Sequence, residues 1–216
     1  MSSGCGCSST TVKFDGLSKG YRRALWLVIV LNAAMFVTEM AGGIAAGSKA
    51  LQADALDFLG DTATYGLSLA VIGMAPAVRS RAALVKGASL ALMAAWVLGS
   101  TLYSVLVTGM PRAEVMGAIG LLALAANLAS VLLLMKWKDG DANVRSVWLC
   151  SRNDAIGNVA VMLAAGGVWA SSTPWPDLGV AALMAGLFLW SSIHIIRQAR
   201  AELAAPVPAP TCSAAE

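Results

Sequence analysis

The stretch Leu51-Gln52-Ala53-Asp54-Ala55-Leu56-Asp57-Phe58-Leu59-Gly60-Asp61 places three aspartates inside an apolar run that is long enough to cross a membrane. Residues at positions i, i+3 and i+7 of an α-helix share one face, so these three acids form one anionic stripe. An ionised carboxylate at the centre of a bilayer costs about 3 kcal/mol on insertion scales, and such residues normally face a bundle interior, a water-filled cavity or a cation. The simplest partner for this stripe is a positive ion.

The composition of the whole chain indicates a membrane protein. Its 216 residues are 58% hydrophobic and 12% charged, whereas soluble domains carry about 25% charged residues. Each crossing of a bilayer needs a run of about 20 predominantly apolar residues. Six such runs can be placed, at residues 24–46, 51–74, 82–108, 113–135, 146–170 and 177–196. The sequence therefore predicts an all-α integral membrane protein, a bundle of six transmembrane helices.

The distribution of basic residues predicts how this bundle is oriented. They flank the start of the first run, the connections between runs two and three and between runs four and five, and the end of the sixth: Lys13, Lys19, Arg22, Arg23, Arg79, Arg81, Lys86, Lys136, Lys138, Arg145, Arg197 and Arg200. The opposite connections hold only Lys49 and Arg112. The positive-inside rule then places both termini in the cytoplasm, and we expect the inner (plasma) membrane of a prokaryote. A nucleic-acid partner is not expected, because no basic cluster lies outside the flanks of the runs.

Both ends of the chain are expected to be short cytoplasmic tails around a transmembrane domain at residues 24–199. Residues 1–23 lack the charged and apolar regions of a signal peptide and predict a mobile tail. Residues 200–216 are rich in proline and small residues and predict disorder. Cys5 and Cys7 could hold a soft cation, but two ligands on a mobile tail make a poor site, so a tail that merely contains cysteines is the alternative.

A second group of polar residues lies on the fifth run. Cys150, Asp154 and Asn158 recur every four residues, which turns a helix by only about 40° per step, so they share a face. An ion pair with an arginine on another helix is the alternative interpretation of Asp154. Counted along the helices, both acidic groups approach the middle of the bilayer, where alternating-access transporters bind their substrates. Carboxylates with one thiolate would make a tetrahedral site for a zinc-like ion.

Four polar residues suggest a path to this site. Asp54 is nearer the outer side than Asp57, and is interpreted as an access-path acid or a charge near a helix N-terminus. Asn32 and Glu39 share a face of the first run. Glu39 could relay protons, with a structural hydrogen bond as an equal alternative. Asn158 belongs to the same candidate path.

These residues resemble the motifs of the cation diffusion facilitators, a family that exports divalent transition metals, chiefly zinc, in exchange for protons. The resemblance runs from about residue 32 to the end of the sixth run. It rests on Gly47-Ser48-Lys-Ala-Leu51-Gln-Ala-Asp54-Ala-Leu-Asp57-Phe-Leu-Gly-Asp61 and Asp154-Ala-Ile-Gly-Asn-Val159. In that family a ligand pair on the second span and another on the fifth hold the metal. The resemblance implies Asp57 and Asp61 as the first pair, and Asp154 with Cys150 as the second.

Two departures from the family pattern affect the expected function. Cys150 stands where the family usually has His or Asp. Either a thiolate here shifts preference towards cadmium, mercury or zinc and away from manganese, or position 150 does not bind the metal. The family's cytoplasmic metal-binding and dimerising domain is absent after Arg200. We therefore expect a short form of the family, with any homodimer made through the transmembrane helices.

The sequence predicts a transporter and not an enzyme. Neither a nucleophile beside a general base nor a phosphate-binding loop is visible. The expected substrate is a divalent transition metal (zinc, or cadmium, mercury or cobalt) exported from the cytoplasm by proton antiport, with no permanently bound cofactor. Two other classes stay open: a proton-coupled exporter of small organic cations, and a non-transporting membrane metal sensor or subunit.

Overall fold

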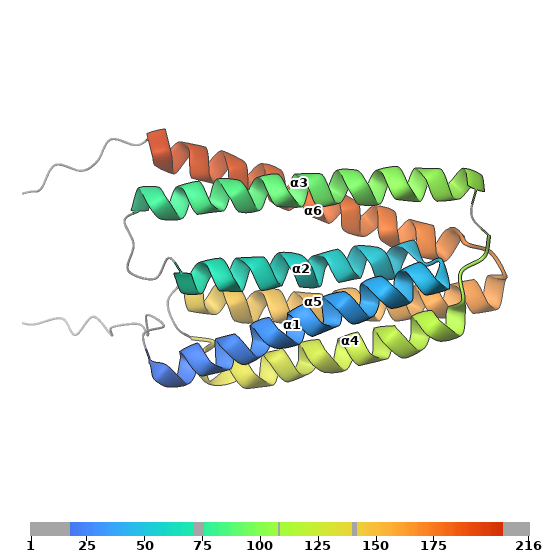
Figure 1. The fold of residues 1–216 in the computed structure, drawn as a ribbon, viewed down its shortest axis with the longest axis horizontal. Helices are drawn as coiled ribbons and strands as arrows, with labels where there is room; N and C mark the ends of the chain where they lie inside the picture. Colours follow the sequence, from blue (N-terminus) through green and yellow to red (C-terminus); the bar gives the residue numbers. More distant parts are fainter. Residues whose placement is uncertain (1–17, 71–75, 108, 140–141, 205–216) are drawn as a thin grey trace, which may run out of the picture.

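The fold is a bundle of antiparallel helices. A computed structural model describes residues 18–70, 76–107, 109–139 and 142–204. These residues form α1 (Lys19–Ala46), α2 (Lys49–Ala70), α3 (Pro76–Val107), α4 (Ala113–Leu134), the 3-10 turn η1 (Met135–Trp137), α5 (Ala142–Ser171) and α6 (Trp175–Ala204). Successive helices run in opposite directions, so α1 begins and α6 ends at the same end of the bundle (Figure 1). The predicted all-α class is confirmed over the described residues.

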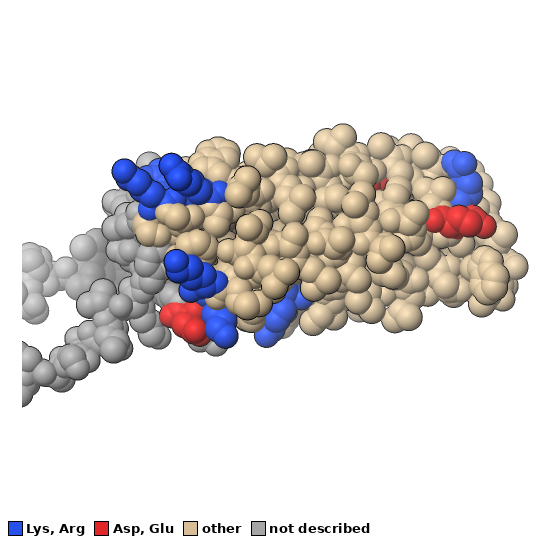
Figure 2. Space-filling model, turned by 90° about the horizontal axis from the view of Figure 1, so that it is seen from below, with Lys and Arg blue, Asp and Glu red and all other residues tan. Residues whose placement is uncertain are grey.

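Five of the helices, α1, α3, α4, α5 and α6, are long and apolar enough to cross a membrane. Their outer surfaces expose more large apolar side chains than the surface of a water-soluble protein does. Leu106, Trp169 and Leu92, for example, are 84%, 74% and 72% exposed. Figure 2 shows charged side chains gathered towards the two ends of the molecule, with a largely uncharged belt between them. The chain is a multi-pass membrane protein.

Helix α2 differs from the other five because it carries the aspartate stripe and is too polar to qualify on hydropathy. It lies inside the bundle, where it packs against α1, α3, α5 and α6. None of the large apolar side chains exposed on the described surface belongs to α2. Its 22 residues span about 33 Å, enough to cross a hydrocarbon core about 30 Å thick. The prediction that α2 is a sixth span therefore rests on its position among the other helices.

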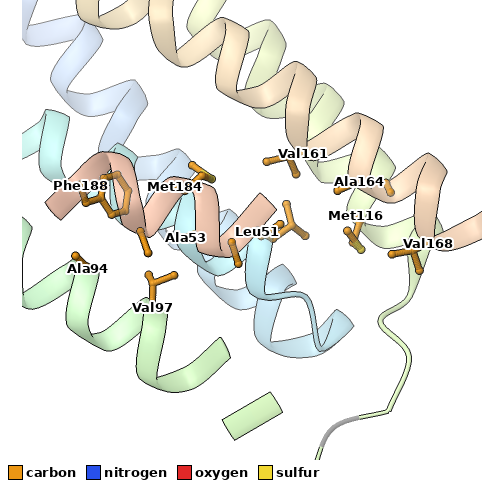
Figure 3. Close-up of a cluster of buried hydrophobic side chains, with 14 of the residues drawn as sticks. Leu51, Ala53, Ala94, Val97, Met116, Val161, Ala164, Val168, Met184 and Phe188 are labelled. Carbon is orange, nitrogen blue, oxygen red and sulfur yellow. The ribbon is translucent and has the colours of Figure 1, made fainter. Parts of the chain in front are cut away.

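An apolar cluster holds the first half of α2 in place. Leu51 and Ala53 of α2 lie among side chains from the four other helices around them, as Figure 3 shows: Ala94 and Val97 of α3, Met116 of α4, Val161, Ala164 and Val168 of α5, and Met184 and Phe188 of α6. On its other side α2 touches α1 at Gly43, where an added Cβ would lie only 3.0 Å from the backbone nitrogen of Gln52. A small residue is needed for this close approach.

Three helix ends lie five or more residues outside the predicted runs. Helix α1 begins at Lys19, because the Ser18 hydroxyl accepts a hydrogen bond from the Tyr21 amide (3.2 Å) and caps it, so residues 19–23 are helical and not part of a tail. Helix α3 begins at Pro76 and not at residue 82, since proline is well suited to the first helical position. Helix α6 continues through residues 200–204. Residues 71–74 of the predicted second span, Cys5, Cys7 and the rest of the tails lie outside the described residues.

Candidate metal-binding site

Three carboxyl groups from two helices meet inside the bundle. Asp57 and Asp61 of α2 each form a side-chain hydrogen bond with Asp154 of α5. All three are half-buried. A hydrogen bond between two carboxyls requires a proton on one of them, because ionised carboxylates only accept. The structure thus brings together the acid pair of the second run and the acid of the fifth.

Tyr65 fixes the position of Asp61 within this cluster. Its hydroxyl donates to Asp61 Oδ2, and it also lies 3.4 Å from the Val147 carbonyl oxygen and 3.4 Å from Ser151 Oγ, both on α5. The Tyr65 ring is completely buried. It therefore orients one carboxylate and ties α2 to α5. The sequence interpretation missed this role, although the spacing of four residues between Asp61 and Tyr65 was a usable signal.

A lysine on a third helix faces the acid pair. Lys86 of α3 is half-buried and interacts electrostatically with both Asp57 and Asp61. The sequence analysis counted it with the connection between the second and third runs, although it lies inside the run 82–108, and the structure places it within α3. Arg152, in contrast, is exposed and lies over the Trp148 ring, with its guanidinium carbon 5.6 Å from the ring centroid. Lys86 is thus a positive charge at the site that sequence reasoning did not find.

The predicted fourth ligand, Cys150, lies on α5 one turn before Asp154, and its side chain is outside the described part of the structure. Among the side chains that the structure does describe, no group of three or more His, Cys, Asp or Glu is arranged to hold a metal ion. The described carboxyls are joined in pairs through Asp154. A four-ligand site that includes Cys150 stays a prediction.

The residues of the predicted access path are all buried. Asn32, Glu39, Asp54 and Asn158 are 1%, 0%, 1% and 0% exposed. Glu39 of α1 and Asp54 of α2 interact with each other across the helix interface. Apart from that contact between the two carboxyls, the described residues offer no direct hydrogen-bond partner to the Glu39 oxygens, Asp54 Oδ2, Asn32 Oδ1 or the two polar side-chain atoms of Asn158. Buried polar groups are normally satisfied, so each of these exceptions calls for an explanation.

Asp177, the first residue of the sixth predicted run, is a structural acid to which the sequence analysis gave no role. It lies in the first turn of α6 and is 1% exposed. Its carboxylate accepts from Ser48 Oγ (2.6 Å), the Lys49 amide (2.7 Å) and the Ala50 amide (3.1 Å), and so caps the N-terminus of α2. The role of a charge at the start of this helix, considered for Asp54, belongs to Asp177. No local pattern could have revealed a pairing across so many residues.

Carboxyl groups held together inside a bundle of membrane-crossing helices define a class of integral membrane proteins that handle cations within the bilayer. Residues 25–204 match the cation efflux transmembrane domain. The chain belongs to the cation efflux family, which confirms the predicted resemblance.

Two curated relatives come from bacteria. The metal cation efflux system protein CzcD of Cupriavidus metallidurans is 28% identical over 177 residues, which cover 76% of this chain and 56% of the relative. The cation efflux system protein CzcD of an Alcaligenes strain gives the same identity and coverage. The chain therefore spans about half the length of these relatives. Family membership points to a transporter and not to a catalytic enzyme.

Proposed function

We propose that this protein exports a divalent transition metal, with zinc as the first candidate, from the cytoplasm across the inner membrane of a bacterium in exchange for protons. The observation that carries the proposal is the meeting of Asp57 and Asp61 on α2 with Asp154 on α5 inside the bundle. Membership of the cation efflux family supports it, as do the names of the two relatives. Metal and protons are substrates here.

Protons and metal would compete for the same oxygen atoms. Each contact between Asp154 and an α2 aspartate requires a shared proton, whereas a carboxylate must be deprotonated before it can bind a metal. Metal binding therefore releases protons, and protonation from the other side of the membrane releases metal. Lys86 offsets part of the negative charge, which favours release of a doubly charged ion over its retention. This exchange needs no nucleotide.

The choice of metal depends on the fourth ligand. Three aspartates alone offer only oxygen donors, which suit many divalent ions. Cys150 would add a thiolate and complete a tetrahedral site, the geometry that zinc prefers. Cadmium, mercury and cobalt are the other candidates for such a mixed oxygen and sulfur site.

The test is metal flux into liposomes that contain the purified protein and a trapped metal-sensitive dye. Zinc, cadmium, cobalt and manganese are compared with and without a pH gradient, at clamped membrane voltage. We expect zinc flux that follows the pH gradient and is lost in Asp154→Asn. Asp139→Asn, the same change at an exposed position after η1, is the matched control and should transport normally.

Three outcomes would contradict the proposal. Full flux in Asp154→Asn would remove the site from the mechanism. Flux that persists unchanged when the pH gradient is collapsed would exclude proton exchange. Zinc binding without any flux would identify a membrane sensor in place of a transporter.

A further inference from the structure

A second pair of acids lies on the α1–α2 interface, outside the set of proposed metal ligands. Glu39 of α1 and Asp54 of α2 are 0% and 1% exposed and interact with each other. Asp54 lies about one helical turn from Asp57, towards the start of α2. Both oxygens of Glu39 and Oδ2 of Asp54 are buried, and no N–H or hydroxyl group among the described residues donates a hydrogen bond to them. The mechanism proposed above does not use this pair.

The charges around this pair are of the wrong sign to neutralise it. Glu39 interacts electrostatically with Asp54 and Asp57, which are both acidic. Lys86 acts on the Asp57 and Asp61 carboxyls further along α2. Two ionised carboxylates in this position would be both desolvated and mutually repelling. The pair therefore needs a cation of its own.

The neighbouring polar side chain of Gln52 is already engaged. Its Nε2 donates to the Gly43 carbonyl oxygen at 3.2 Å, and its Oε1 accepts from Lys49 Nζ at 3.3 Å. The Gln52 side chain thus hydrogen-bonds to the α1 backbone and to Lys49, and not to Glu39 or Asp54.

A proton fits this pair better than a metal ion. Zinc and similar ions need about four ligands. The described His, Cys, Asp and Glu residues offer no third ligand beside Glu39 and Asp54. A proton needs only one oxygen from each carboxyl. We propose that Glu39 and Asp54 form a proton-binding site, separate from the metal ligands, that holds a proton between the two carboxyls.

The position of the pair couples it to the metal site. Asp57 interacts electrostatically with both Glu39 and Asp54. A divalent ion bound at Asp57 replaces a neighbouring negative charge with a positive one, which weakens proton binding at the pair. The remaining charged groups that face the α2 stripe, Asp154 of α5 and Lys86 of α3, act on Asp57 and Asp61. Metal binding at Asp57 then releases a proton that was bound at the Glu39–Asp54 pair and not at a metal ligand. This second step rests on the proposed function, whereas the existence of the proton site does not.

The first experiment tests the proton site without metal. Infrared spectra of the purified protein at neutral pH report protonated carboxyls by a C=O absorption that shifts in heavy water. We expect Glu39→Gln and Asp54→Asn each to remove part of this absorption. Glu114→Gln, which changes an exposed acid in the first turn of α4, should leave it intact. Either variant alone decides the matter, so one that fails to fold does not prevent the test. No such absorption in the wild type, or an unchanged one in the folded variants, overturns the proposal.

The second experiment tests the coupling. Zinc is added to the detergent-solubilised protein in weak buffer, and proton release is followed with an indicator dye beside zinc binding by equilibrium dialysis. Glu39→Gln should bind as much zinc as the wild type but release about one proton fewer per ion. Equal proton release would exclude the coupling, and a lost equivalent of zinc would make the pair a metal site. If the wild type binds no zinc, the proposed function fails while the infrared result still decides the proton site.

Discussion

Replacing Asp177 by Asn tests how the bundle holds the acid-bearing helix. The Asp177 carboxylate uses both oxygens to bind Ser48 Oγ and the amides of Lys49 and Ala50, and the residue is buried. Asn keeps one acceptor oxygen but presents an NH₂ group to a donor. A buried donor left without an acceptor costs about 1–3 kcal/mol. Loss of the negative charge at the helix N-terminus costs up to about 2 kcal/mol in a buried setting.

Together these terms predict that Asp177→Asn destabilises the protein by about 1–5 kcal/mol. At about 2–4 °C per kcal/mol for a chain of this size, the apparent Tm should fall by about 2–20 °C. The assay is thermal unfolding in detergent at a fixed heating rate, followed by tryptophan fluorescence, with Asp139→Asn as the exposed control. Asp177→Ala should be worse, because it leaves all three donors unpaired. If the apparent Tm of Asp177→Asn equals that of the Asp139→Asn control, the cap does not stabilise α2.

Three further changes probe the packing and the site. Gly43→Ala should destabilise the protein by about 1–3 kcal/mol, because its Cβ would meet the α2 backbone; an unchanged melting temperature would show that the helices can separate freely. Tyr65→Phe removes only the hydroxyl that holds Asp61 and should lower zinc affinity about 10–100-fold in equilibrium dialysis. Tyr103→Phe, at an exposed position, should leave zinc affinity unchanged. Equal zinc affinities of the two variants would exclude Tyr65 from the site. Cobalt bound to the wild type should show a thiolate charge-transfer absorption that Cys150→Ala removes, and its persistence would assign the sulfur to another cysteine.

The sequence predicted the helices well where hydropathy decides them. The runs of about 20 apolar residues in α1, α3, α4, α5 and α6 agree with the observed helices to within a few residues at most ends. A second run was predicted at residues 51–74, but the three acids lower the mean hydropathy of α2, which does not qualify as a membrane span on hydropathy alone. The early start of α3 at Pro76 was missed, and Lys86 was assigned to the preceding connection although it lies inside the predicted run 82–108.

The candidate site could be predicted only as far as helical spacing reaches. The shared face of Asp57 and Asp61 follows from sequence, and the midplane position of Asp154 follows from counting residues along α5. The remaining contacts around the site join segments that are far apart in the sequence. Asp177 binds a helix N-terminus 127–129 residues earlier, and Glu39 meets Asp54 only because Gly43 lets α1 approach α2. Such pairings depend on tertiary packing, which leaves no periodic signal in the chain.

Zinc binding to Asp61→Asn and Asp154→Asn tests the central claim most directly. Equilibrium dialysis would be carried out on protein in which Cys5 and Cys7 are changed to Ser, so that the N-terminal tail cannot contribute ligands. If one ion is held between α2 and α5, the parent protein binds a zinc ion per chain and each single variant loses it, although the two residues lie on different helices. Wild-type zinc affinity in either variant would contradict the account.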